Sequence, residues 1–245
     1  MIKYFIGSCF MIFLLASCTK ENDNFTLESV NDYFPLQVGK YITYDLDSTI
    51  FTNFNQEMTT KHYQAQYRVD TAVTDNLGRA AFNISRYLRT DSTQPWTIDN
   101  VFTAVPSGKS IELIQDNLRF IKLMEPIKDG ASWKGNIYLP YDPYRSYSFA
   151  DPVFTEDWDY TYEAVDSSLT IGSNNFPNTI TVAEIDDTIG DPNVPGTKYA
   201  ERTYSVEKYA KNVGLIYKEF IHWEYQSIDN TYTGFGEKLS IIDHN

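Results

Sequence analysis

The chain has 245 residues, a size that allows one large domain or two small ones. Hydrophobic residues make up 42% and aromatic residues 16%, which excludes intrinsic disorder over most of the length. The 33 acidic residues outnumber the 20 basic ones, and the formal net charge is -13. Because an acidic surface repels phosphate backbones, nucleic acid is not expected as a partner.

The first 17 residues have the pattern of a secretory signal peptide. Lys3 supplies a positive charge, and a run of 13 uncharged, mostly apolar residues follows from Tyr4 to Ala16, too short to span a bilayer. The segment Leu15–Cys18 resembles the bacterial lipobox, in which a branched apolar residue and two small residues precede a cysteine. The resemblance implies that residues 1–17 are removed. It also implies that Cys18 carries a diacylglycerol and a further acyl chain such as palmitate.

An acylated Cys18 leaves the mature chain without a pair of thiols, because Cys9 belongs to the signal peptide. We therefore expect a membrane anchor of two or more acyl chains and a fold without disulfides. Residues 18–31 are predicted to form a flexible acidic tether. Its Lys20-Glu21 start resembles an export signal of outer-membrane lipoproteins, which favours the cell surface over the periplasmic face.

Residues 32–245 are predicted to form a single all-β domain. Apolar and polar residues alternate with a period of two over Lys40–Asp47, Lys61–Thr74, 157–164 and 215–225. This alternation predicts that Tyr67 and Trp223 face the core. Weaker strand patterns lie near 80–90, 96–105, 110–114, 118–124, 179–185, 198–209 and 237–242. The pattern favours an antiparallel, meander-like sheet that forms a sandwich or a curved, partly closed barrel.

Turn sequences separate these segments at 76–78, 107–108, 172–175 and 212–214. Two longer stretches break the strand pattern and are predicted as loops. One, near 140–157, is rich in proline and could divide the domain into two lobes. The other covers 186–197 and is polar.

Two motifs resemble a group of uncharacterised bacterial lipoproteins. The first, Tyr33–Tyr44, follows their aromatic-Pro-Leu-x-x-Gly-x-aromatic-x-x-Tyr pattern, with Tyr41 where Trp is commoner. The second, Tyr209–Tyr217, is similar to their Tyr-Ala-x-Gly-Val-Gly-Leu-Val segment, with Asn212 in place of Gly. The resemblance implies membership of a Gram-negative outer-membrane lipoprotein family and no particular activity.

Four sites resemble an O-glycan acceptor of bacterial exported proteins, in which Asp precedes a Ser or Thr. Thr71 is predicted to lie on the apolar face of a strand and is not expected to be modified. The remaining acceptor residues are Ser48, Ser92 and Thr188, and Thr188 in its polar loop is the best candidate. Short matches of this kind also arise by chance in a chain rich in Ser, Thr and Asp.

No catalytic motif is complete. The three histidines, His62, His222 and His244, lack the spacing of a zinc site, so neither a metal nor another cofactor is expected. A weak Ca²⁺ candidate is a group of loop oxygens without the spacing of an EF-hand, and a solvated loop is the favoured interpretation. The residues of this candidate are Asp186, Asp187, Asp191 and Asn193.

One aromatic loop is the candidate binding surface, because loop tyrosines give rigid, amphipathic contacts. The alternative is that its rings plug one end of the β core. Its residues are Tyr138, Tyr141, Tyr144, Arg145, Tyr147 and Phe149.

The leading hypothesis for function is a lipid-anchored, non-enzymatic binding or accessory module with a glycan or protein ligand. One alternative is a carrier that holds an apolar ligand in a β cavity, which requires an internal cavity lined by aromatic side chains. The other is a carbohydrate-active hydrolase, which requires two facing carboxylates in a cleft.

Overall fold

The structure of the protein is a computed structural model that describes residues 28–150, 152–153 and 155–245. The predicted signal peptide, Cys18 and most of the predicted tether lie outside the described residues. The strands are β1 (Tyr41–Thr52), β2 (Glu57–Thr74), β3 (Ala80–Arg89), β4 (Thr97–Ser107), β5 (Ser110–Gln115), β6 (Leu118–Met124), β7 (Ser132–Trp133), β8 (Tyr160–Ile171), β9 (Asn174–Ile189), β10 (Tyr199–Ala210), β11 (Gly214–Gln226) and β12 (Thr231–His244). The helices are α1 (Val30–Tyr33) and a 3-10 turn, η1 (Arg145–Tyr147).

All strands belong to one 12-stranded sheet, in the order β6-β5-β4-β3-β2-β1-β12-β11-β10-β9-β8-β7. Each pair is antiparallel, and every pair but one joins two strands that are consecutive in the chain. The exception joins β1 to β12, with Ile42 opposite His244, in the middle of the sheet. The predicted all-β meander is confirmed, and the four predicted turns lie at strand connections.

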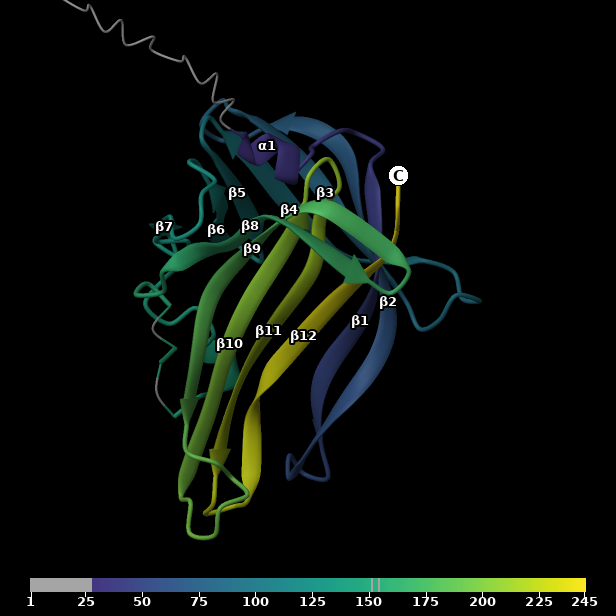
Figure 1. Ribbon diagram of the computed structural model, residues 1–245. Helices are drawn as coiled ribbons and strands as arrows, with labels where there is room; N and C mark the ends of the chain where they lie inside the picture. Colours follow the sequence, from purple (N-terminus) through teal and green to yellow (C-terminus); the bar gives the residue numbers. More distant parts are fainter. Residues whose placement is uncertain (1–27, 151, 154) are drawn as a thin grey trace, which may run out of the picture.

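The sheet curls until its two edges approach each other (Figure 1). The amide of Ile121 on β6 donates a hydrogen bond to the carbonyl of Gly135, just after β7, at 2.8 Å. The indole of Trp133 on β7 donates to the carbonyl of Ile121, also at 2.8 Å. The sheet is therefore a nearly closed barrel, which confirms the curved form predicted from the sequence and not the sandwich.

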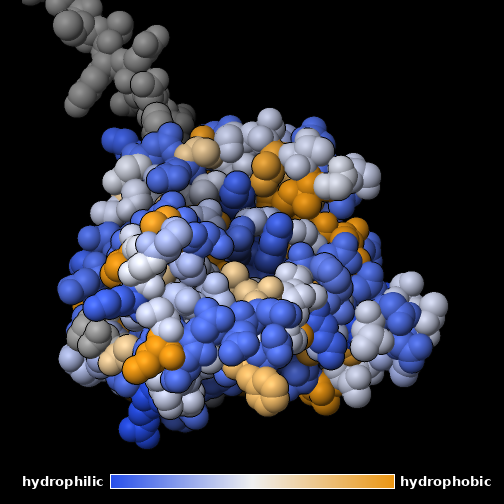
Figure 2. All heavy atoms as spheres, turned by 90° about the horizontal axis from the view of Figure 1, so that it is seen from below, coloured by the Kyte–Doolittle hydropathy of each residue, from blue (hydrophilic) through white to orange (hydrophobic). Residues whose placement is uncertain are grey.

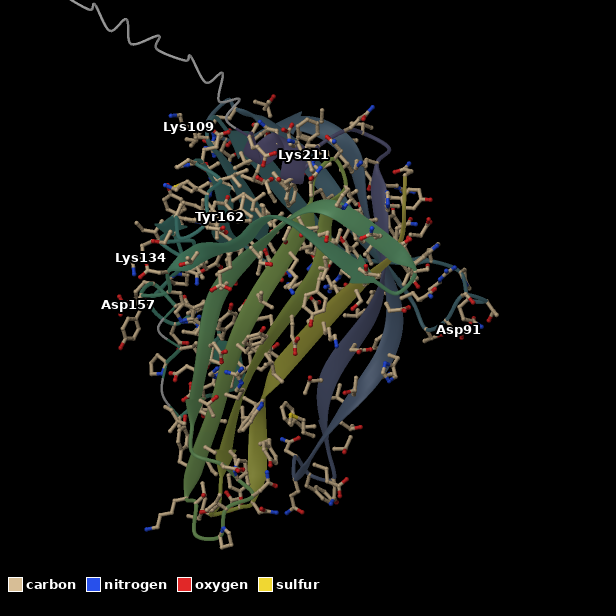
Figure 3. The ribbon with its side chains drawn as sticks, viewed as in Figure 1. Asp91, Lys109, Lys134, Asp157, Tyr162 and Lys211 are labelled. Atoms are coloured by element: carbon tan, nitrogen blue, oxygen red, sulfur yellow. The ribbon has the colours of Figure 1, made fainter. Side chains whose placement is uncertain are left out.

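Helix α1 covers one end of the curled sheet, called the α1 end below. Val30 and Tyr33 are fully buried there, and Lys211, which lies beside α1 in Figure 3, forms an ion pair with Glu28. The residues from Glu28 to Asn31, predicted as the end of the tether, are therefore folded against the domain. No helix of the described chain is long and apolar enough to cross a membrane.

The opposite end, called the hairpin end, carries the β1–β2, β9–β10 and β11–β12 turns (Figure 1). The predicted 186–197 loop is shorter than expected, because β9 continues to Ile189 and pairs there with Glu201 of β10. The connection between β7 and β8 runs from 134 to 159 and contains η1. The strands on both sides of this connection belong to the same sheet.

Alternation predicted the inward face correctly for β2, where Ala65 and Val69 are buried and Tyr67 contacts the rings of Tyr44 and Phe102. The prediction for β11 was wrong. Ile216 and His222 are fully buried in this strand, whereas Trp223 on the opposite face is only half-buried. The inward face of β11 carries polar residues that find partners inside the barrel, so its hydrophobic pattern pointed to the wrong side.

Candidate functional site

The barrel contains an internal cavity of about 590 Å³ between the curved sheet and the β7–β8 connection. Seen from the hairpin end, the surface is hollowed near its centre, among mostly hydrophilic side chains (Figure 2). Most of the side chains that line the cavity are charged or aromatic. They include Arg86, Lys122, Glu184, Glu207, Lys218 and Glu237, and Phe120, Tyr144, Tyr147, Trp158, Tyr160, Phe220 and Phe235. A cavity of this size is in the range of small-molecule sites.

Lys122 on β6 lies between two carboxylates. Its Nζ is 2.8 Å from an oxygen of Glu184 on β9 and 2.8 Å from an oxygen of Glu207 on β10. All three side chains are buried. Burial alone would lower the pKa of Lys122, but the two negative charges outweigh it and the pKa is raised. The same burial raises the pKa of Glu184, and the Lys122 charge only partly opposes this.

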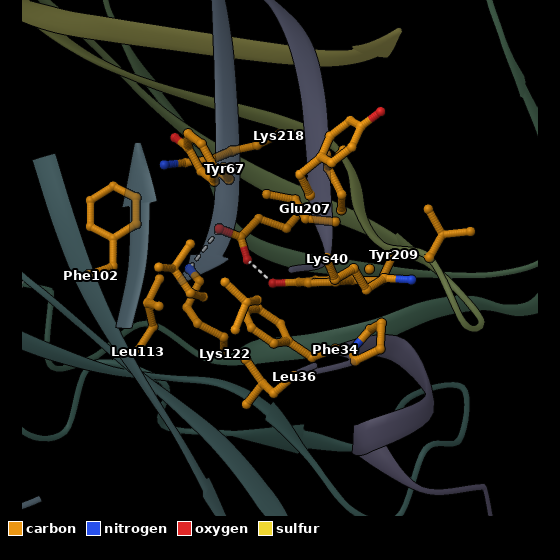
Figure 4. Close-up of a pocket in the computed structure, with 18 of the residues that line it drawn as sticks. Phe34, Leu36, Lys40, Tyr67, Phe102, Leu113, Lys122, Glu207, Tyr209 and Lys218 are labelled. Atoms are coloured by element: carbon orange, nitrogen blue, oxygen red, sulfur yellow. Dashed lines mark hydrogen bonds and ion pairs between the residues drawn. The ribbon is translucent and has the colours of Figure 1, made fainter. Parts of the chain in front are cut away.

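The second oxygen of each carboxylate is also occupied. The Ser205 hydroxyl donates to Glu184 at 2.6 Å. The Tyr209 hydroxyl donates to Glu207, as Figure 4 shows. Each carboxylate is therefore held from both sides, as a buried charge requires.

A second chain of charges lies beside the first. Glu237 on β12 is 2.9 Å from Lys218 Nζ and 3.1 Å from a guanidinium nitrogen of Arg86. Arg86 also contacts Asp99. Burial would raise the pKa of Glu237, but the two cations hold it below the ordinary value. We call the six side chains of Arg86, Lys122, Glu184, Glu207, Lys218 and Glu237 the ionic layer.

The ionic layer separates the cavity from a smaller apolar pocket of about 80 Å³ beneath α1. Lys122, Glu207 and Lys218 line both spaces, and Figure 4 shows them at the polar side of the smaller pocket. Phe34 and Leu36, which follow α1, lie on its apolar side. The interior of the barrel is thus apolar beneath α1 and becomes charged at the ionic layer, which lines the cavity.

Aromatic rings form the wall of the cavity next to the ionic layer. Phe220 and Phe235, from neighbouring strands, have ring centroids 5.1 Å apart. Tyr144 from the β7–β8 connection packs on both, at 6.0 Å from Phe220 and 5.1 Å from Phe235. Trp158 contacts Phe220 at 6.3 Å. The rings lie at tilted or edge-to-face angles, which favours a well-packed wall.

The predicted aromatic loop divides between the surface and this wall. Tyr138 and Tyr141 are 56% and 62% exposed, and Arg145 in η1 is also exposed. Tyr144 points inward, and Tyr147 lines the cavity while remaining 41% exposed. The ring of Phe149 packs edge to face on His222 at 4.3 Å.

His222 is the buried histidine of the described chain. Its Nδ1 is 2.9 Å from the Thr203 hydroxyl, whereas no described residue is a hydrogen-bond partner of its Nε2. Burial lowers the pKa of His222 to about 4, against a weaker opposing effect of the Glu201 charge. The imidazole is therefore neutral at pH 7. His62, in contrast, is exposed and contacts Asp47.

The predicted glycan acceptors lie in three different settings. Ser48 on β1 lines the cavity, Thr188 lies on β9, and Ser92 lies in the exposed β3–β4 connection.

The four Ca²⁺ candidates are engaged in local contacts. Asp186 pairs with Arg202 at 2.6 Å, Asp187 accepts from the Thr188 amide, and Asp191 accepts from Asn193. No group of three or more His, Cys, Asp and Glu side chains in residues 28–150, 152–153 and 155–245 is arranged to hold a metal ion.

Sequence reasoning missed the ionic layer. Its residues occupy inward positions of strands and look like solvent-facing charges in the alternation. A signal was present in Glu184, which follows Ile180 and Val182 on the same face of β9, and in Glu237, which precedes Leu239 and Ile241 on β12.

No protein-family model matches the chain. No curated protein matches it either. Among solved structures, a proposed exported protein with a YmcC-like fold from Bacteroides fragilis is 14% identical, with a TM-score of 0.32, over 86% of this chain and 99% of that one. A proposed lipoprotein from Parabacteroides distasonis is 13% identical, with a TM-score of 0.33, over 87% and 98%.

Proposed function

We propose that the protein is a lipid-anchored binding protein of the cell envelope that takes a small ligand into its internal cavity. The observation that carries the proposal is the cavity of about 590 Å³, lined jointly by the ionic layer and by aromatic rings. Barrel interiors of this kind are common ligand sites, because the strands fix the lining side chains in place.

The chemistry of the lining favours a ligand with polar groups over a purely apolar one. An apolar molecule against Lys218, Glu184 and Glu237 would remove water from charged groups without replacing its hydrogen bonds, which costs free energy. The aromatic wall, in turn, favours a ligand with some apolar surface. The proposal therefore changes the carrier hypothesis from an apolar to an amphipathic ligand.

The same contacts favour binding over hydrolysis. A glycoside hydrolase needs one carboxylic acid to protonate the leaving oxygen and one carboxylate facing the sugar. Here Glu184 and Glu207 share Lys122, and their remaining oxygens accept hydrogen bonds from Ser205 and Tyr209. Both carboxylates are thus engaged by the protein's own groups.

The anchor part of the proposal rests on Lys3, the apolar run and the lipobox-like Leu15–Cys18 segment. We propose acylation of Cys18 and an outer-membrane location, with the cell surface favoured. Replacing Cys18 by Ser should abolish incorporation of labelled palmitate and leave the protein either soluble or uncleaved, since the mature chain has no other cysteine to carry the thioether. A Cys18→Ser chain that is cleaved after residue 17 yet stays in the membrane would contradict the anchor.

Ligand binding can be tested without knowing the ligand. A library of small, chemically mixed fragments is screened by ligand-observed NMR against the full chain and against Ser48→Trp, which places an indole in the cavity. The matched control is Thr60→Trp, at an exposed position of β2 outside the cavity lining. We expect fragment signals that disappear in Ser48→Trp and persist in Thr60→Trp.

Ser146→Trp, which fills the cavity from the exposed loop side, provides a second blocking variant if Ser48→Trp does not fold. Equal fragment binding by the blocked and control variants would refute the cavity as the ligand site, as would a complete absence of binding.

A further inference from the structure

The ionic layer carries no surplus charge toward the cavity. Two chains of alternating sign compose it: Glu184, Lys122 and Glu207 in one, and Lys218, Glu237 and Arg86 in the other. Among the lining residues of the layer, three cations thus match three carboxylates; Asp99, the other partner of Arg86, is not a lining residue. Asp116, the remaining charged lining residue, is exposed at the rim and accepts a hydrogen bond from Asn100 at 3.1 Å, so water screens it.

A balanced layer discriminates against charged ligands of either sign. A carboxylate or phosphate that approaches Lys218 also approaches Glu237, 2.9 Å away from that lysine. An ammonium group that approaches Glu184 also approaches Lys122, at 2.8 Å from that carboxylate. Because attraction and repulsion nearly cancel, an ion gains little inside while it loses its hydration.

Donors and acceptors nevertheless face the cavity in close alternation. Ammonium groups only donate hydrogen bonds and carboxylates only accept them, whereas a ligand hydroxyl can do both. The lining also includes the hydroxyl-bearing residues Ser48 and Ser146. Tyr144, which also lines the cavity, carries a further hydroxyl. A ligand with several hydroxyls can form hydrogen bonds with both the ammonium groups and the carboxylates, and it adds no net charge to the cavity.

The aromatic wall adds a shape requirement. Phe220, Phe235 and Tyr144 pack together on one side of the cavity, with Trp158 at their edge. Flat rings contact a ligand best through a flat apolar face, such as the C–H face of a six-membered saturated ring. An open-chain polyol has no such face, and an alkyl chain has no hydroxyls for the ionic layer.

On these grounds, and resting on the proposed function, we infer that the cavity takes a neutral cyclic polyol, that is, an uncharged sugar of one or two rings. Its hydroxyl edge faces the ionic layer and its C–H face packs on Phe220 and Phe235.

The inference is tested by calorimetric titration of the full chain, reconstituted in phosphatidylcholine vesicles so that no sugar-based detergent is present. The probes are glucose, N-acetylglucosamine and cellobiose as neutral sugars, decanoate as an anion and decyltrimethylammonium as a cation. We expect saturable binding of at least one neutral sugar and none of either ion to the cavity, as judged by loss of the signal in Ser48→Trp.

Two variants then separate the contributions of the lining. Tyr144→Phe keeps the ring and removes the hydroxyl, and it should weaken sugar binding about fivefold, the effect of one neutral hydrogen bond. Phe235→Leu removes the flat ring and should weaken binding about tenfold. The controls are Tyr138→Phe, on the exposed part of the loop, and Phe51→Leu, whose ring stacks on Tyr232 away from the cavity lining.

Each alternative result has a distinct meaning. If a charged probe binds in the cavity and no neutral sugar does, the ligand class is wrong while the proposed binding function stands. The same holds if mixed fragments bind in the cavity and none of the three sugars does. If sugar binds equally well to Ser48→Trp, the sugar site lies elsewhere and the inference is overturned. Equal weakening in the Tyr138→Phe control would remove the role assigned to Tyr144.

Discussion

The two halves of the barrel interior are built by the same strands and differ in chemistry. Near the α1 end, Leu239 and Ile241 of β12 are buried in an apolar core with Ile216 of β11. Toward the hairpin end, the same two strands contribute the ion pair of Lys218 and Glu237. Phe220 and Phe235 form the next layer. The comparison teaches that a cavity arises here from a change of residue type along continuous strands, without any change in the backbone architecture.

The largest effect is expected where the two halves meet. Lys122→Met leaves Glu184 and Glu207 buried without their shared cation, which should lower the free energy of unfolding by about 4 kcal/mol. The matched control is Lys134→Met, which breaks an exposed pair with Asp159 and should cost less than about 1 kcal/mol. Urea denaturation measures both. Similar losses for the two variants would show that the ionic layer is as hydrated as the surface.

The apolar half should respond strongly to a lost side chain. Leu239→Ala removes a fully buried side chain and leaves a void, so the free energy of unfolding should fall by about 3 kcal/mol. Phe235→Leu, beside the existing cavity, should cost only about 1 kcal/mol, because its ring already borders open volume. Thermal melting compares the two variants. A larger loss for Phe235→Leu would mean that the ring wall, and not the α1 half, holds the fold together.

Acid should weaken the cavity half through His222. Its folded-state pKa of about 4 lies below the ordinary 6.5, so the unfolded chain binds more protons in this range. The stability from neutral His222 is complete above pH 6.5 and is lost as the pH falls toward 4. By pH 5 the loss of stability amounts to about 2 kcal/mol. Denaturation midpoints at pH 7.5, 6 and 5 for the wild type and His222→Gln give the difference. Identical pH profiles would contradict a buried neutral imidazole.

The smallest effect is expected on the outer face of β11. Trp223 is half-buried and contacts Tyr232 edge to face at 5.6 Å. Trp223→Ala should therefore cost about 1 kcal/mol, the worth of a cross-strand aromatic pair. Thermal melting provides the measurement. A loss as large as that of Leu239→Ala would indicate that the outer face is more closely covered than the exposure of Trp223 suggests.

The sequence was sufficient for the parts of the fold that depend on local pattern. Alternation in β2 identified Tyr67 as inward-facing, and the glycine and asparagine turns located the hairpins. The prediction from alternation failed in β11, because the pattern cannot distinguish a charged side chain that faces water from one that pairs with an opposite charge inside the barrel. Lys122 and Glu184 are 62 residues apart, and only the closed sheet brings them together. For that reason the candidate site could not be predicted from the sequence alone.

The pairing of β1 with β12 also constrains the order in which the protein is made. Because the chain is synthesised from its N-terminus, the hairpins of β1–β6 can form early. The edge of β1 that pairs with β12 then keeps unpaired backbone groups until residues 231–244 have been made. Such long-range pairing is slow, because closing a large loop costs conformational entropy before any contact between the strands compensates for that loss. During synthesis the half-made sheet is therefore the stage most exposed to aggregation. A stop codon before β12 would leave two separate sheets with unpaired edges, which makes the truncated chain a substrate for chaperones and proteases.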